Sequence, residues 1–238
     1  SSAASDVYKR QVNKEDKSLA WILGDPTGWD GVDPSYFFTP EGEDFEWFYA
    51  QHNVSILDNG DIALFDNGTA KVKRVDGDNR VSGDNVYSRA VVYQIDTENM
   101  TVSQVTEYGK ERGADWYSDW ISGVVSLDGT QDHLWITAGS HLHSDEENRS
   151  DYYPKDMFVQ GLTKTTHIDQ VDNGELSFEL TISGDTYNAL TYRSFRMPLY
   201  TEGKYDPSAV PEVLGSLGET SYAVSYTHLR AHETLMNL

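Results

Sequence analysis

The stretch "QHNVSILDNGDIALFDNG", which runs from Gln51 to Gly68, decides the fold. Apolar and polar residues alternate on both sides of the pair Asn59 and Gly60. Such alternation predicts half-buried strands, and Asn-Gly adopts the positive φ angles that a tight hairpin turn needs. The stretch therefore predicts two antiparallel strands joined by a turn. His52 stands at the entrance of the first strand, where the alternation does not require a histidine.

The chain downstream continues the same pattern. "RAVVYQID" (Arg89–Asp96) alternates, and "MTVSQVTEYG" (Met100–Gly109) follows after a short turn. Residues 52–109 therefore predict four consecutive strands joined by hairpins. Upstream, "WILGDPTGW" (Trp21–Trp29) predicts a strand that ends in a Pro/Gly turn, and "PEGEDFEWFYA" (Pro40–Ala50) predicts either a short helix or a loop over the core.

A second copy of the opening pattern begins at Ile121. The segment "ISGVVSLDGTQDHLWITAGS" (Ile121–Ser140) has the same form as the opening stretch, and Val124 matches Val54. In this alignment Ser122 takes the place of His52. The sequence thus contains two hairpins of the same pattern, one with a histidine at its entrance and one with a serine.

Four-stranded units that repeat at ~60–70 residues predict the blades of a β-propeller, longer than the usual ~40–45 residues because of inserted loops. The second unit would be completed by strands at "DMFVQGLT" (Asp156–Thr163) and "ELSFELTIS" (Glu175–Ser183), and "NALTYRSFRMPLY" (Asn188–Tyr200) would form a closing strand. We therefore expect an all-β fold, in which residues 12–223 form a partial β-propeller of about two blades plus a closing strand. If the first strand of each blade is innermost, His52 lies at one mouth of the central channel.

The two ends of the chain share no periodicity with their neighbours. Residues 1–11 ("SSAASDVYKRQ") and 224–238 ("VSYTHLRAHETLMNL") resemble translated sequencing-adapter sequence, of the kind found in reading frames assembled from metagenomic reads. We expect both to be artefacts, which removes His228 and His232 from the candidate ligands. The alternative is a real C-terminal helix. A truncated frame also predicts that a signal segment and further active-site residues lie upstream.

Composition bounds the function classes. The chain has 238 residues, a net charge of -21, 38% apolar residues and no cysteine. The length suits one large all-β domain or two ordinary ones. The acidic balance argues against nucleic acid and anionic membrane surfaces as partners, and no run of about 18 apolar residues predicts a membrane span. The absence of cysteine excludes disulfides, thiolate metal sites and a cysteine nucleophile.

Several of these segments together resemble the C-terminal half of bacterial arylsulfate sulfotransferases. The similarity extends in order from Trp21 to Tyr200 and includes "YSDWISGVVSL" (Tyr117–Leu127). It is most specific in "YSRAVVYQIDTENMTVSQVTEYGKERG" (Tyr87–Gly113). The resemblance implies a six-bladed propeller that often pairs as a homodimer. It also implies export to the periplasm or another extracytoplasmic place, with no insertion into the membrane.

The resemblance further implies a chemistry. Such enzymes transfer a sulfuryl group from a phenolic sulfate ester to a phenol acceptor, without a nucleotide donor and without a cofactor. Their active-site histidine attacks sulfur and carries the group as a sulfohistidine, and it sits in a "QH" step that here is Gln51-His52. The family usually has Asp after this histidine, whereas this chain has Asn53. A carboxylate at this position therefore cannot orient the imidazole here. A further histidine pair and an arginine are implied to lie in blades outside this chain, so the fragment itself is expected to be inactive.

A histidine suits this reaction because a neutral imidazole is a good nucleophile near pH 7. A covalent intermediate would divide the transfer into two in-line steps with ping-pong kinetics. Three alternatives remain open at this point: His52 is an ordinary strand-end residue, the chain is a non-catalytic propeller that binds a carbohydrate or protein, or it hydrolyses sulfate esters on the same scaffold.

Other candidate residues are weaker. Arg89 opens a strand and could bind the sulfate, although a structural salt bridge is the plainer interpretation. Tyr192 could line the aryl pocket by stacking, or could pack between closing blades. His133 lies in a turn and His141 and His143 lie in a polar loop, so no metal site is predicted. The Asp/Asn-Gly segments favour hairpin turns over calcium loops.

Overall fold

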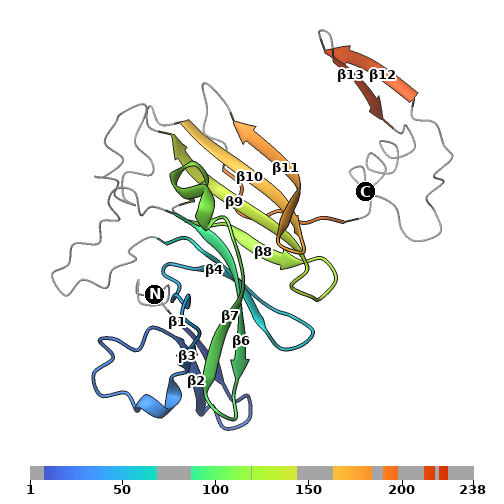
Figure 1. The fold of residues 1–238 in the computed structure, drawn as a ribbon. Helices are drawn as coiled ribbons and strands as arrows, with labels where there is room; N and C mark the ends of the chain where they lie inside the picture. The colour runs from blue at the N-terminus through green and yellow to red at the C-terminus, as the bar shows by residue number, and fades with distance from the viewer. Residues whose placement is uncertain are drawn as a thin grey trace. The chain divides into compact units, whose positions relative to one another are not determined.

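A computed structural model describes residues 8–68, 87–118, 120–143, 163–183, 190–197, 212–217 and 220–224. The chain divides into two compact units, Ser1–Arg196 and Met197–Leu238. The described part of the second unit is an antiparallel hairpin of β12 (Glu212–Leu217) and β13 (Thr220–Val224). The first unit holds two larger sheets, drawn in Figure 1, and carries every candidate site residue that the structure describes.

The first of these sheets confirms the four strands predicted over residues 52–109. Its strands are β4 (His52–Ile56), β5 (Ile62–Asp66), β6 (Arg89–Asp96) and β7 (Thr101–Tyr108), each antiparallel to the next. The short strand β3 (Thr39–Glu41) adds to β7 in parallel. The hairpin turn falls at Gly60, whose φ of 93° explains why the sequence has Asn-Gly there.

The second sheet repeats the antiparallel arrangement. Its strands are β8 (Gly123–Ser126), β9 (His133–His143), β10 (Thr163–Asp172) and β11 (Glu175–Ser183), in the order β11-β10-β9-β8. The strand predicted at Glu175–Ser183 is confirmed. Residues 156–162 of the strand predicted at Asp156–Thr163 lie outside the described parts, and the strand β10, which begins at Thr163, was not predicted. The sequence of β10 is mostly polar, which hid its alternation.

The closing strand predicted over Asn188–Tyr200 is wrong for the part that the structure describes. Residues 190–197 form no strand. They run along the second sheet instead: the Thr191 amide donates to the Gly139 carbonyl at 3.0 Å, and the Trp135 indole donates to the Ser194 hydroxyl at 2.9 Å. The Ser194 amide donates to the Thr137 hydroxyl and not to a backbone carbonyl, so no regular ladder forms and strand propensity alone misplaced this segment.

The N-terminal region packs on the first sheet. The strand β2 (Leu19–Gly24) confirms the one predicted at Trp21 and pairs with β1 (Tyr8–Val12), so the artefact boundary expected at residue 11 falls inside a strand. A 3₁₀ helix, η2 (Pro34–Tyr36), follows. The segment Pro40–Ala50 takes the loop alternative, apart from its start in β3.

Two hydrophobic clusters hold these layers. One lies between the sheets, where Phe65 and Val92 from the first sheet and Leu134 and Ile136 from the second are fully buried around Trp116. The other lies on the far face of the first sheet and joins it to the N-terminal region through side chains that include Leu23, Phe38, Phe48, Leu64 and Tyr93. The first sheet thus buries apolar side chains on both of its faces, which the aromatic-rich composition anticipates.

The first strands of the two sheets, β4 and β8, lie side by side (Figure 1). The Asn53 amide and the Ser55 hydroxyl both donate to the Val124 carbonyl, at 2.7 and 3.0 Å. Antiparallel four-stranded units that pack face to face and meet at their first strands are consistent with neighbouring propeller blades. The described residues are all-β apart from 3₁₀ turns, and they do not close a ring. No segment in these described parts is a helix long and apolar enough to cross a membrane.

A buried carboxylate ties the second sheet to the 3₁₀ helix η4 (Lys110–Trp116). The Asp169 carboxylate is fully buried and accepts from the Arg112 guanidinium at 2.9 Å and the Trp116 indole at 3.0 Å through one oxygen. Its other oxygen has no partner among the described residues. Burial is the largest effect on this group and raises the pKa of Asp169 to about 6, although Arg112 opposes the shift.

This raised pKa gives a testable pH dependence. Between about pH 4 and 6 the folded chain binds more protons at Asp169 than the unfolded chain, so the contribution of this residue to the free energy of unfolding falls as the pH rises through that window. We expect the difference in unfolding free energy between the parent chain and Asp169→Asn to fall by roughly 2 kcal/mol from pH 4 to pH 7. Urea titrations across this range measure it, and a difference that stays constant with pH would contradict the assignment.

Candidate functional site

His52 is the first residue of β4 and pairs with Phe65 of β5. The register shifts between His52 and Ser55, and Asn53 inside this irregularity has a φ of 49°. Ala50, two residues before the histidine, has a φ of 56°. Non-glycine residues seldom adopt positive φ, and bulges of this kind re-aim side chains. The backbone on both sides of His52 is therefore held in an unusual conformation that sets the direction of a half-buried imidazole.

The partner of the imidazole is Asn67, just after the end of β5. The distance between His52 Nδ1 and Asn67 Oδ1 is 2.7 Å. Asn67 is fully buried, and its Nδ2 donates to the backbone carbonyls of Ser118 at 2.7 Å and Ile121 at 3.2 Å. The Ser88 hydroxyl donates to the Asn67 carbonyl at 2.9 Å. Because both ends of the buried Asn67 amide form hydrogen bonds, this side chain is a rigid support for the histidine.

The side-chain hydrogen bond of Asn53 goes to the second sheet and not to the imidazole of His52. The Asn53 amide donates to the Val124 carbonyl in β8. The doubt raised by the missing Asp therefore has a structural answer: the residue after the histidine joins the two sheets, and the side chain that holds the ring comes from a different strand. Sequence reasoning missed Asn67 because its motif, "FDNG", reads as a turn.

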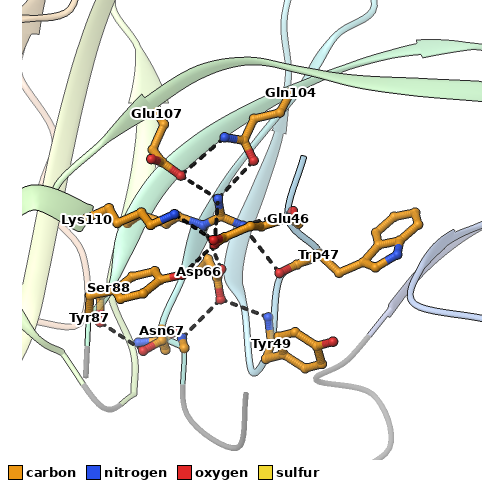
Figure 2. A network of polar contacts seen from close by, with 12 residues as sticks. Glu46, Trp47, Tyr49, Asp66, Asn67, Tyr87, Ser88, Gln104, Glu107 and Lys110 are labelled. Atoms are coloured by element: carbon orange, nitrogen blue, oxygen red, sulfur yellow. Dashed lines mark hydrogen bonds and ion pairs between the residues drawn. The ribbon is translucent and has the colours of Figure 1, made fainter. Parts of the chain in front are cut away.

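The motif "FDNG" (Phe65–Gly68) does more than turn the chain, as Figure 2 shows for the residues around Asp66. Asp66 is fully buried, and its Oδ1 accepts from the backbone amides of Tyr49 at 2.8 Å and Gly68 at 3.0 Å. Gly68 has a φ of 69°, and a Cβ there would lie 2.3 Å from the Tyr87 carbonyl oxygen. Asp66 thus fixes the chain on one side of Asn67, and glycine is required on the other.

Arg89 is fully buried and joins the polar network around Asp66. Its Nε donates to Asp66 at 2.9 Å, and its Nη1 donates to Gln104 at 2.9 Å and to Glu107 at 2.5 Å. Its Nη2 donates to the carbonyls of Glu46 and Trp47 and to the Tyr93 hydroxyl. Burial lowers the pKa of Arg89, but the acceptors around it outweigh that effect and raise it above its ordinary value.

This geometry bears on the two interpretations of Arg89, sulfate binding and a structural salt bridge. The guanidinium has no exposed surface and all of its donor nitrogens are engaged within the chain. The plainer interpretation, a structural salt bridge, fits what is seen. Arg89 stabilises Asp66, and Asp66 precedes the asparagine that holds His52.

The second sheet supplies an internal comparison. Ser122 and Gly139 occupy the positions that match His52 and Asn67, and the Gly139 amide donates to the Ser122 hydroxyl at 3.0 Å. The scaffold thus joins the same two positions in both units. Ala138 replaces Asp66 in the second unit, so the fold does not need the buried ion pair, the asparagine or the histidine at these places.

Tyr192 lies elsewhere. Its side chain is 63% exposed, and the Arg193 guanidinium lies 5.3 Å from its ring centroid. The neighbouring Thr191 anchors this segment to Gly139 of β9. The described contacts therefore place Tyr192 on the surface of the second sheet and do not join it to His52.

The remaining histidine candidates do not assemble a metal site in the described residues. His133 is partly exposed, and its Nδ1 lies 2.8 Å from Asp172, whose hydrogen bond raises the pKa of His133. His141 and His143 fall in β9, and the positions of their side chains lie outside what the structure describes. Within the described ranges, no group of three His, Asp or Glu residues could hold a metal ion.

Comparisons with known proteins agree with one another. A family model described as "Arylsulfotransferase (ASST)" matches residues 8–193. The chain is 31% identical over 197 residues to arylsulfate sulfotransferase AssT of Escherichia coli O6:H1, covering 75% of the chain and 30% of that protein. It is 31% identical over 168 residues to arylsulfate sulfotransferase AssT of Lelliottia amnigena, covering 61% of the chain and 27% of that protein. The chain thus spans less than a third of the length of these curated relatives.

Proposed function

Because the chain belongs to the arylsulfotransferase family, we propose that the protein transfers a sulfuryl group from a phenolic sulfate ester to a phenol, with His52 as the covalent carrier. The observation that carries the proposal is the setting of His52. It is a half-buried imidazole, flanked by strained backbone and held by a buried amide, at a position where the matching unit manages with serine. Positive φ recurs at Ile121 and Ser122 of the matching unit and so belongs to the scaffold, whereas the buried amide that faces the imidazole has no counterpart there. Buried polar contacts that the fold does not require are typical of functional sites.

The reaction has two steps. In the first, a ring nitrogen of His52 attacks sulfur, an N–S bond forms, the bond from sulfur to the aryl oxygen breaks, and phenolate leaves with the electron pair. In the second, the oxygen of the acceptor phenol attacks sulfur, the N–S bond breaks with its electron pair returning to the ring nitrogen, and the phenolic proton passes to solvent water. Each step is in line at sulfur and places negative charge on the peripheral oxygens, as in phosphoryl transfer. The scheme predicts ping-pong kinetics.

Arg89 does not supply the positive charge that the sulfate needs, because its donors are already used. We therefore assign sulfate binding to groups outside the described site, and the resemblance implies a histidine pair and an arginine from other blades. No cofactor, nucleic acid partner or membrane insertion enters this proposal. An extracytoplasmic place and a homodimer are proposed on the resemblance alone.

An assay with 4-nitrophenyl sulfate tests the proposed reaction. The full-length protein carrying this chain is incubated with the ester in the presence and absence of phenol, and release of 4-nitrophenol is followed. Release that depends on phenol and yields phenyl sulfate is the expected result. Equal release without phenol would identify a hydrolase instead, and no release with any phenolic donor would favour a binding module.

A further inference from the structure

The contacts of Asn67 determine which nitrogen of His52 carries the proton. The Asn67 nitrogen faces two backbone carbonyls, which can only accept, so this end of the amide must be Nδ2. The other end, facing the imidazole, is therefore Oδ1, which can only accept. The His52 nitrogen at 2.7 Å from it must then donate, which places a proton on Nδ1. In the neutral ring the lone pair is left on Nε2.

We propose that Asn67 is a positioning residue for sulfuryl transfer, which holds His52 in the Nδ1–H tautomer and so presents Nε2 as the nitrogen that attacks sulfur. This inference rests on the proposed function. The lone pair of Nε2 forms the N–S bond while the aryl oxygen leaves with its electron pair, and no proton moves in this step. The proton on Nδ1 stays bonded to Asn67 Oδ1 while the ring carries the sulfuryl group. When the acceptor attacks, the N–S pair returns to Nε2 and the starting tautomer is restored.

The surroundings of Asn67 suit this role. A free imidazole in water favours the opposite tautomer, with the proton on Nε2, so an enzyme that attacks through this nitrogen needs a fixed acceptor at Nδ1. The acceptor here cannot rotate, because the same amide is bound to Ser118 and Ile121. The preceding residue is locked by the buried Asp66–Arg89 ion pair at 2.9 Å. The matching position in the second unit is Gly139, which has no side chain to orient a ring.

The tautomer can be measured without any enzymatic activity. Long-range ¹H–¹⁵N correlation spectra of the full 238-residue chain, labelled with ¹⁵N-histidine at a pH where the rings are neutral, show which nitrogen of each of the seven histidines carries the proton. The His52 signals are identified as those that disappear in His52→Gln. We expect protonated Nδ1 and unprotonated Nε2 for His52. The opposite pattern in the parent chain would overturn the proposal before any variant is made.

Variants separate positioning from support of the fold. Asn67→Ala removes the acceptor, and His52 is expected to move toward the Nε2–H form. Asn67→Asp keeps an acceptor at the same place and is expected to retain the Nδ1–H form, even where it costs stability. Ser55→Ala is the matched control, because it removes one side-chain hydrogen bond near the site, to the Val124 carbonyl, but none to His52. If Asn67→Ala leaves the tautomer unchanged, or Ser55→Ala changes it as much, Asn67 does not set it.

Activity completes the test in the full-length protein. Asn67→Ala is expected to lower kcat for transfer from 4-nitrophenyl sulfate on the order of 10- to 100-fold with a smaller change in KM, since the reacting nitrogen is misplaced while the sulfate contacts remain. Asn67→Asp should recover part of this loss. A changed tautomer with full activity would refute the positioning role, whereas parent protein that shows the predicted tautomer but no transfer would refute the proposed function alone.

Discussion

Replacing His52 by alanine is expected to abolish sulfuryl transfer while leaving the chain folded. The proposed carrier of the sulfuryl group is lost, and removal of a covalent nucleophile costs about 10⁴-fold or more in kcat. Stability should change by less than about 1 kcal/mol, because the matching position in the second unit is served by Ser122 in the same scaffold. Rates of 4-nitrophenol release with phenol present, and urea unfolding of the same variant, measure the two quantities.

The control for this experiment is His133→Ala. His133 is a partly exposed histidine that pairs with Asp172 on the second sheet, and its loss should leave the transfer rate unchanged. Transfer that survives in His52→Ala at a rate close to that of the parent would remove His52 from the mechanism. Equal losses in the His52 and His133 variants would show that the assay reports general damage to the fold.

Replacing Arg89 by methionine is expected to destabilise the chain by about 3–5 kcal/mol, because the change leaves the buried Asp66 carboxylate without its cation. Methionine approximates the length of the arginine stem, so the result reports the lost charge and hydrogen bonds more than a lost side-chain volume. The Glu107 carboxylate, which lies nearer the surface, can turn toward water and should contribute less. Urea unfolding of the full chain measures the effect.

A double variant tests the physical reason. In Arg89→Met with Asp66→Asn, the unpaired charge is removed while residue 66 can still accept from the amides of Tyr49 and Gly68. The double variant should therefore be more stable than Arg89→Met alone, with a coupling free energy of at least about 1 kcal/mol. A loss of less than about 1 kcal/mol in Arg89→Met would contradict the structural role assigned to this residue.

The sequence anticipated the parts of the fold that local patterns encode. Alternation and Asn-Gly placed β4 to β7, and the repeat at Ile121 placed β8 and the start of β9. The repeat also indicated that the hairpin does not require a histidine at position 52, since the matching residue is Ser122. The strand β10 was not predicted because buried polar residues such as Thr166 and Asp169 break its alternation of apolar and polar residues. These side chains can be buried in the strand because groups in other segments form hydrogen bonds with them.

The site itself depended on contacts that no local pattern reveals. Asp66 and Asn67 have the composition of a hairpin turn, and only the fold brings Arg89 to one of them and His52 to the other. The sequence held one clue, which was the comparison between the two units. Ala138 and Gly139 occupy the positions that match Asp66 and Asn67, so a unit of this design does not need Asp and Asn there for the turn alone. The sequence could not identify the partners of Arg89, since its burial depends on strands and loops distant in sequence.

Detection of the covalent intermediate tests most directly whether His52 carries the sulfuryl group. The full-length protein is mixed with 4-nitrophenyl sulfate without an acceptor, quenched under alkaline conditions, digested, and analysed by mass spectrometry for a peptide that has gained one sulfuryl group. If His52 carries the sulfuryl group, the adduct is expected on the peptide that contains His52, it should disappear when phenol is added before the quench, and it should be absent in His52→Ala. An adduct on another residue, or steady transfer with His52 never modified, would contradict this role of His52.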